Sequence, residues 1–195
     1  MNIKGLAICL SSSILALGAV GTAHADNDDD RDRRGEHKRY EPKHHEGELV
    51  RTVRDATRRF KDVNRAMAEG YQLLFGCVSG PDDGAMGLHY VNMALVGDGV
   101  LDPRKPEIVI YEPLPNGGRR LIGADFLVFS DAWHASNTGT PELGGQLLHL
   151  FESPNRFGLP AFYTLHVWAW KHNPTGAFVN WHSNVSCEQF SGTEQ

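Results

Sequence analysis

The hydrophobic period of the chain changes at Gly70. Before this residue, apolar side chains recur every three or four positions from Leu49 to Met67, with basic residues between them. This spacing predicts an amphipathic helix that ends near Gly70. After Gly70 the helical period disappears, and short apolar segments alternate with turn signals, which is typical of β-strands. A helix followed by a run of strands predicts an α+β fold.

Turn signals divide the second part of the chain into strands. Four segments have the composition of strands, and a fifth is short: residues 88–96, 107–112, 120–129, 161–170 and 177–181. The Asn-Gly pair within 113–118 predicts a hairpin between the second and third segments. Asn-Pro-Thr-Gly at 173–176 predicts a chain reversal after the fourth. We therefore expect a long N-terminal amphipathic helix packed on a mostly antiparallel, curled sheet of about five strands.

The first residues have the pattern of a secretory signal peptide that is cleaved after Ala25. Lys4 precedes an apolar run from Leu6 to Val20, and Ala-His-Ala ends the segment. This run is shorter than the roughly 20 residues of a membrane-spanning helix. We therefore expect a periplasmic or extracellular protein with no transmembrane segment after cleavage.

Residues 26–48 are charged and predicted to form a disordered leader, and residues 49–190 a single globular domain. The leader histidines could bind stray metal, although a solvated spacer is the simpler interpretation.

The cysteines and the charge limit the possible partners. Cys9 lies in the signal peptide, so that Cys77 and Cys187 remain in an oxidising compartment, where we expect a disulfide between them. A pair of metal-binding thiolates is the alternative, which oxidation disfavours. Residues 71–195 carry twelve acidic and six basic residues. An acidic domain of this kind is a poor partner for nucleic acid.

Each of the four longer strand segments carries one polar group among apolar neighbours: His89, Glu112, Asp125 and His166. If these faces converge, two histidines and a carboxylate meet and suit a divalent transition metal such as zinc, copper or iron. His149 is a further candidate ligand. The alternative is that the histidines are core residues with hydrogen-bond partners, and that Asp125 pairs with an arginine or a backbone donor. Three histidines near predicted turns are expected at the surface: His134, His172 and His182.

The segment "FYTLHVWAW" allows a second interpretation. In a strand, alternate side chains from Phe162 to Trp170 share one face, so that His166 lies in an aromatic row. Trp168 and Trp170 could then bind a carbohydrate or a small apolar molecule without metal. Alternatively, the N-terminal helix buries this row. No nucleophile elbow or phosphate-binding loop is present, and whether the protein is an enzyme stays open.

Several segments together resemble a group of secreted bacterial proteins of unassigned activity. The segments are "GAMGLHYVN", "PEIVIYEP", "LHVWAWKHNPTGAF" and "NVSC". The shared pattern is Met-Gly-x-His-Tyr-Val-Asn, then Leu-His-Val-Trp followed by Asn-Pro-x-Gly, and a terminal Val-Ser-Cys. The likeness runs from Tyr71 to Cys187. It implies that His89 and His166 belong to signature segments. This chain has His182 followed by serine where similar proteins often have Asn-Pro.

Overall fold

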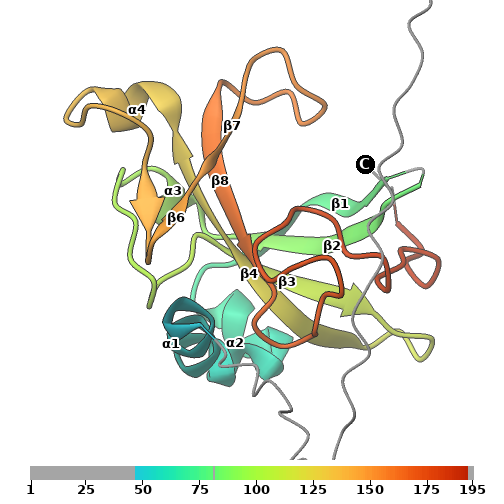
Figure 1. Ribbon diagram of the computed structural model, residues 1–195. Helices are drawn as coiled ribbons and strands as arrows, with labels where there is room; N and C mark the ends of the chain where they lie inside the picture. Colours follow the sequence, from blue (N-terminus) through green and yellow to red (C-terminus); the bar gives the residue numbers. More distant parts are fainter. Residues whose placement is uncertain (1–46, 81, 193–195) are drawn as a thin grey trace, which may run out of the picture. The chain divides into compact units, whose positions relative to one another are not determined.

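Six strands form one antiparallel sheet in the order β1-β2-β3-β4-β8-β7 in the computed structural model, which describes residues 47–80 and 82–192 (Figure 1). The strands are β1 Gln72–Gly80, β2 Gly84–Val91, β3 Ile108–Pro113, β4 Arg119–Phe129, β7 His149–Phe151 and β8 Phe162–Val167. A separate hairpin joins β5 Glu142–Leu143 to β6 Gln146–Leu147. The six-stranded sheet curls into a half-barrel, so that β1 and β2 run across the direction of β8 in Figure 1.

The curled antiparallel sheet and its turns agree with the sequence pattern. β3 and β4 pair through the predicted hairpin, whose turn is closed by a hydrogen bond from Leu114 N–H to Gly118 O at 3.0 Å. The predicted reversal at 173–176 is also confirmed, because Gly176 N–H donates to Asn173 O at 3.2 Å. β2, β3, β4 and β8 overlap the four predicted segments.

Several strands differ from the prediction. Residues 177–181 form no strand, whereas β1 and β7 are strands that the pattern did not reveal. The segment predicted as 88–96 leaves the sheet after Val91 and ends in the short helix α3, Met93–Val96. Asn92 causes this change, because its side chain accepts a hydrogen bond from Ala94 N–H at 3.1 Å and so begins the helix.

In place of one continuous helix, the N-terminal part forms three consecutive segments: α1 Glu48–Thr57, the 3-10 helix η1 Arg58–Lys61 and α2 Val63–Ala68. Asp62 is extended, and its side chain accepts a hydrogen bond from Asn64 N–H at 3.0 Å. An aspartate N-cap therefore begins a new helix inside the apolar pattern. Gly70 follows α2 with a φ of 95°, as a C′ glycine does. A further short helix, α4 Ser130–His134, follows β4.

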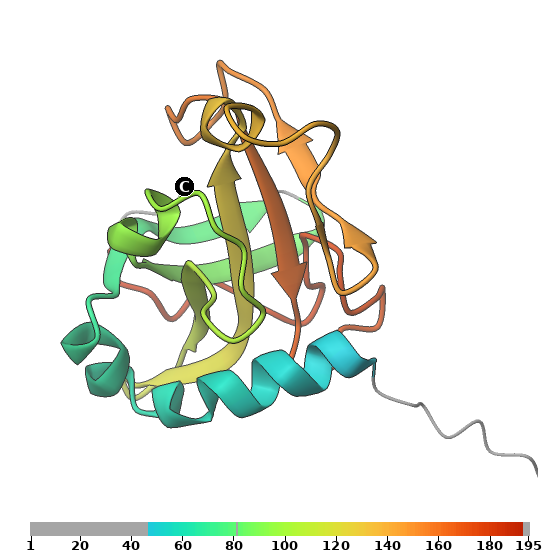
Figure 2. The ribbon, with the colours of Figure 1, turned by 90° about the vertical axis from the view of Figure 1, so that its left-hand side faces the viewer.

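The two faces of the sheet have different coverings. The face that carries Phe126 and Leu165, here called the outer face, packs against Val53 and its neighbours in α1. Figure 2 shows the helical segment that begins with α1 (cyan) passing along one side of the strands. The inner face carries Asp125 and His166. The helix therefore covers mainly the side chains that alternate with His166. Of the expected row, Trp170 contacts it through Thr57 and Arg54, whereas His166 lies on the inner face.

The predicted disulfide is present. Cys77 in β1 is bonded to Cys187, with their Cα atoms 5.8 Å apart. Nearby, Ala85 and His182 form an isolated β-bridge, so the C-terminal segment is held against β1 and β2. The described residues belong to one compact unit, Lys43–Gln195. None of their helices is both long and apolar enough to cross a bilayer. The predicted signal peptide and nearly all of the predicted leader, residues 1–46, lie outside the described residues.

Candidate metal centre

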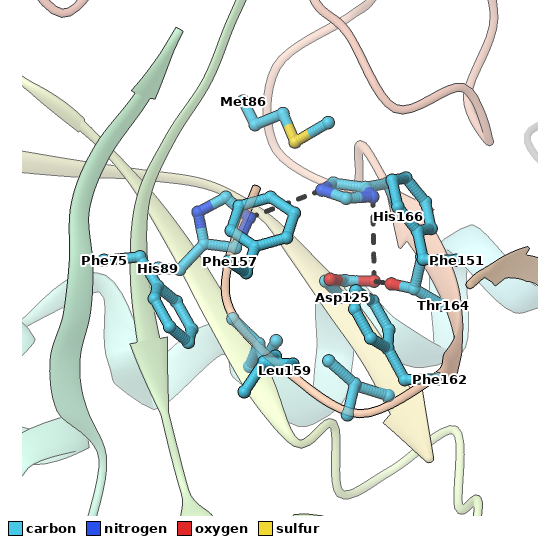
Figure 3. Close-up of a pocket in the computed structure, with 12 residues that line it drawn as sticks. Phe75, Met86, His89, Asp125, Phe151, Phe157, Leu159, Phe162, Thr164 and His166 are labelled. Atoms are coloured by element: carbon cyan, nitrogen blue, oxygen red, sulfur yellow. Dashed lines mark hydrogen bonds and ion pairs between the residues drawn. The ribbon is translucent and has the colours of Figure 1, made fainter. Parts of the chain in front are cut away.

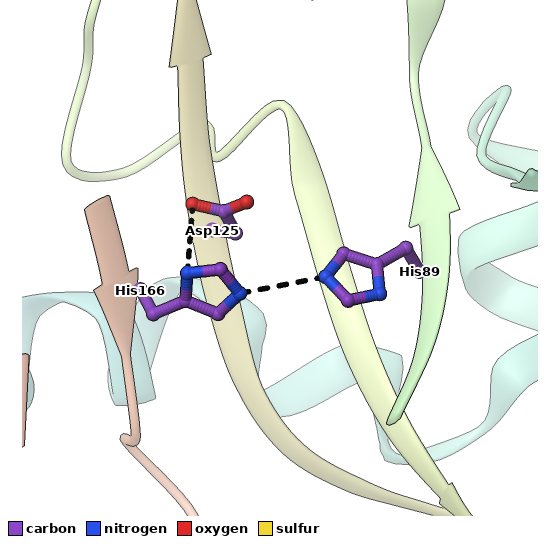
Figure 4. A group of neighbouring side chains, drawn as sticks. All are labelled: His89, Asp125 and His166. Atoms are coloured by element: carbon purple, nitrogen blue, oxygen red, sulfur yellow. Dashed lines mark hydrogen bonds and ion pairs between the residues drawn. The ribbon is translucent and has the colours of Figure 1, made fainter. Parts of the chain in front are cut away.

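Strand register places a carboxylate beside a histidine on the inner face. Asp125 in β4 lies directly opposite His166 in β8, and Thr164 lies two residues before His166. His89 belongs to β2, which is separated from β8 by β3 and β4. In a flat sheet three strand spacings are about 14 Å. The curl of the sheet shortens this separation for side chains on the inner face, so that the two imidazoles meet (Figure 4).

The three side chains are held in fixed orientations. The Nε2 atoms of His89 and His166 are 3.4 Å apart. Nδ1 of His89 lies 3.1 Å from Gly87 O, and Nδ1 of His166 lies 3.7 Å from Oδ1 of Asp125. The Thr164 hydroxyl donates to the same oxygen at 2.5 Å. His89, Asp125 and His166 each offer one ligand atom, and these atoms all lie within 4.8 Å of one another.

Burial sets the protonation of this group. The side chains of His166 and Asp125 are only 3% and 4% exposed. Loss of solvation lowers the pKa of His89 to about 4 and that of His166 to about 3. It raises the pKa of Asp125 to about 6, although His89 and the hydrogen bond from Thr164 oppose this change. At neutral pH the group therefore consists of two neutral imidazoles and one carboxylate.

His166 faces two acceptors with only one proton. The contact between His89 Nδ1 and a backbone oxygen requires the proton of His89 on Nδ1, so its Nε2 carries a lone pair toward His166. On the other side of His166, Nδ1 faces Asp125 and has no hydrogen-bond partner among the described residues. A neutral imidazole has a single N–H and satisfies one side only. A cation between the two Nε2 atoms removes this conflict, because the His166 proton can then face Asp125.

A small cavity lies beside the three side chains. It has a volume of about 30 Å³. Figure 3 shows the imidazoles and the carboxylate facing one another next to phenylalanine rings. Eight apolar side chains line the remaining wall: Phe75, Met86, Ile108, Leu127, Phe151, Phe157, Leu159 and Phe162. A cavity of this size holds one or two water molecules, provided that polar groups bind them.

Two predicted ligands lie elsewhere. Glu112 is on the inner face but at the far end of β3, where Lys171 Nζ donates to it at 2.5 Å and Arg120 forms a second ion pair. Burial alone would raise the pKa of Glu112, but these two cations outweigh it and lower the pKa. His149 is exposed in the outermost strand β7, opposite Thr164 in register, and does not belong to the group.

The two tryptophans of the predicted aromatic platform are held by hydrogen bonds from their indole N–H groups. Trp168 is 3% exposed, and its indole N–H donates to Val179 O at 2.7 Å. Trp170 donates to the hydroxyl of Thr57 at 2.9 Å, and Lys61 Nζ lies 4.2 Å from the centre of its ring. Both indoles line a surface depression near α1, and their N–H groups are already bonded to the Val179 carbonyl and the Thr57 hydroxyl.

Two buried polar residues, His182 and Glu107, and the half-buried Asn180 were missed or misplaced by the sequence pattern. His182 was expected at the surface and is fully buried, with its ring 4.9 Å from that of Trp168. Glu107 is 1% exposed and accepts from Leu127 N–H at 3.2 Å, and burial raises its pKa to about 8. Asn180 interacts with His166 and opposes the lowering of its pKa. Of these residues, only His182 stood out in the sequence, because it lies where the similar secreted proteins often have Asn-Pro.

Comparisons of the chain with protein-family models, with curated proteins and with solved structures give no match. The resemblance to secreted bacterial proteins is therefore not tested by them and stays a prediction.

Proposed function

We propose that the protein is secreted and binds a divalent transition metal ion through His89, His166 and Asp125, as a metal carrier or a small metalloenzyme. The observation that carries this proposal is the pair of Nε2 atoms 3.4 Å apart, with only one proton on His166 for the acceptors on its two sides. Imidazole and carboxylate ligands suit zinc, copper and iron. The disulfide agrees with a protein that matures in an oxidising compartment.

The distance between the two nitrogens favours tetrahedral coordination. Two nitrogens that are each about 2.05 Å from an ion and 3.4 Å from each other subtend about 110° at the ion. This angle is close to that of a tetrahedron and is wider than the 90° of an octahedral site. Zinc is therefore the first ion to test.

The carboxylate has two tasks in this arrangement. Oδ1 of Asp125 faces Nδ1 of His166 and can orient the ring, as a carboxylate does for a metal-binding histidine. Its second oxygen is then available to the ion, because a carboxylate has about four lone-pair sites. Three protein ligands leave one tetrahedral position for water or another molecule. Catalytic zinc sites have this composition, whereas structural sites are closed by four protein ligands.

Metal content of the protein tests the proposal. Protein purified without a histidine tag is dialysed against zinc and then against metal-free buffer, and its zinc is measured by elemental analysis. We expect one equivalent in the wild type and less than about a tenth of an equivalent in His89→Ala and His166→Ala. Wild-type protein that retains less than a tenth of an equivalent of zinc, copper or iron would overturn the proposal.

Two controls separate this centre from other histidines. His149→Ala removes the exposed histidine of β7 and should retain one equivalent of zinc. A variant in which the leader histidines His37, His44 and His45 are all alanine should also retain it. If the leader variant loses the zinc, the ion binds there and not to the buried group.

A further inference from the structure

The cavity beside the metal centre is apolar except at the centre itself. Its polar side chains are His89, Asp125, Thr164 and His166, which face one another (Figure 3). The remaining lining side chains are apolar, and four of the eight are phenylalanines. A molecule that completes the metal shell from this side therefore has one polar end and an apolar body.

The aromatic rings of the wall are arranged for a flat guest. Phe151 and Phe162 stack with centroids 5.2 Å apart and planes at 3°. Phe157 lies 6.4 Å from Phe151 and 6.3 Å from Phe162, and Phe75 lies 5.6 Å from Phe157. These are the separations at which aromatic pairs attract each other. A ring that enters beside Phe157 continues this cluster.

Charge selects the polar end of the guest. A divalent ion with two neutral imidazoles and one carboxylate has a net charge of +1. A net charge surrounded by apolar side chains is costly, and a singly negative head group removes it. Arg156 is exposed next to Phe157 and supplies a positive charge at this side of the pocket. A monoanion is therefore favoured both on approach and when bound.

The loop between β7 and β8 controls access. Phe157 and Leu159 belong to this loop and line the cavity. Asn155 holds the loop together, because its side chain donates to Leu159 O at 2.9 Å and accepts from Phe157 N–H at 3.2 Å. Arg156 links the loop to β1 by a hydrogen bond to Ser79 O at 3.1 Å. The cavity volume of about 30 Å³ is too small for a benzene ring. Ring entry requires the loop to move outward as a unit.

We propose that the ligand of the metal centre is a small aromatic monocarboxylate, whose carboxylate binds the ion and whose ring lies among Phe75, Phe151, Phe157 and Phe162. This inference rests on the proposed metal site. It adds a ligand class to that site and assigns the loop 152–160 as its lid.

Calorimetric titrations of benzoate and acetate into zinc-loaded protein test the inference. The two anions have the same head group, so their difference reports the ring. We expect benzoate to bind at least about tenfold more tightly than acetate, which corresponds to the burial of a few apolar carbons. Benzoate should bind the metal-free protein at least tenfold more weakly than the zinc-loaded protein.

Matched variants on β7 identify the wall. Phe151→Ser removes a ring of the wall and should weaken benzoate at least fivefold, with acetate affinity and zinc content unchanged. Leu150→Ser changes the adjacent residue, which is 46% exposed and points away from the pocket, and should alter neither affinity. Zinc-loaded protein that binds benzoate within threefold of acetate overturns this inference alone. Protein that takes up no zinc overturns the metal site and this inference together.

Discussion

The inner face of the sheet carries two groups of ionisable side chains whose partners differ. At one end, the carboxylate of Glu112 is paired with Lys171 and Arg120. About 13 Å along β3, the carboxylate of Asp125 lies with two imidazoles, and no lysine or arginine is among the described side chains that line the adjacent cavity. Burial acts on both carboxyl groups, yet the pKa is lowered at Glu112 and raised to about 6 at Asp125.

The Glu112 group is a complete ion pair, whereas the Asp125 group lacks a cation. The cations beside Glu112 compensate its loss of solvation, so that group needs nothing further. Around Asp125 the imidazoles are neutral, and the negative charge and the lone pairs are left without a cation. Trp168 stacks on His166, with their ring centroids 5.9 Å apart. The missing cation is what we assign to a metal ion.

The largest expected effect is that of zinc on thermal unfolding. Zinc at one hundred times its Kd should stabilise the protein by about 2.7 kcal/mol. For a chain of this length that raises the melting temperature by about 5 to 10 °C. His166→Phe should abolish the shift, and Glu112→Gln should leave it intact. Scanning calorimetry measures the shift in melting temperature. If zinc raises it equally in the wild type and in His166→Phe, the ion does not complete the Asp125 group.

Removing one cation from the ion pair of Glu112 should destabilise the protein, and this effect does not involve a metal. Lys171→Met leaves Glu112, whose side chain is 11% exposed, with one cation only. We expect a loss of about 2 kcal/mol in the free energy of unfolding, as for a hydrogen bond to a charged group. Urea denaturation measures it. Arg58→Met is the control: its pair with Asp55 is 69% exposed on both sides and should change stability by less than about 0.5 kcal/mol.

Removing an imidazole from the Asp125 group should instead stabilise the protein. In metal-free protein, His166→Phe removes a buried nitrogen that lacks a partner, and the adjacent cavity has room for the larger ring. We expect the free energy of unfolding to rise by about 1 kcal/mol. A destabilisation of similar size in urea would show that the imidazole is satisfied without a metal.

The smallest effect should appear in the acid dependence of stability. The folded pKa of Glu112 lies below its usual value of 4.5, so its contribution to stability is present above pH 4.5 and is lost as pH falls through the folded pKa. The stability difference between wild type and Glu112→Gln should be constant from pH 5.5 to 7 and shrink below about 4.5. A difference that does not change with pH would contradict the lowered pKa.

Glu107 provides the opposite case. Burial raises its folded pKa to about 8, above 4.5 in the unfolded chain, so the contribution of Glu107 to stability is most favourable below pH 4.5 and falls as pH rises toward 8. Glu107→Gln should remove this slope. Urea unfolding of both variants should therefore give curves that approach the wild type below pH 4.5 and depart from it at higher pH in opposite directions, Glu112→Gln toward lower stability and Glu107→Gln toward higher stability.

Much of the site was predictable because strand alternation is local. His89, Asp125 and His166 each follow an apolar pattern of period two, which places them on the face that the curl of the sheet brings together. The same reasoning failed for Glu112, since alternation gives the face of a side chain but not its position along the strand. His149 was misplaced because β7 is short and its histidine is exposed.

Long-range contacts explain the other failures. His182 is buried because the C-terminal segment, tied to β1 by the disulfide, pairs with Ala85. No local pattern contains this contact. β1 was missed because its register with β2 shifts between Leu73 and Cys77, which interrupts the alternation of its side chains. The break in the N-terminal helix was visible in principle, because Asp62 is a favourable N-cap residue.

The irregular backbone of β1 also affects how the protein meets other copies of itself. A half-barrel leaves two sheet edges open, and an exposed edge invites pairing with a foreign strand. At β1, Phe75 and Gly76 have positive φ values of 67° and 66°, so its hydrogen-bonding groups do not form a straight row. The other edge, β7, offers only three residues. An incoming strand therefore finds an interrupted template on one side and a very short one on the other, and fibril growth by strand addition is disfavoured.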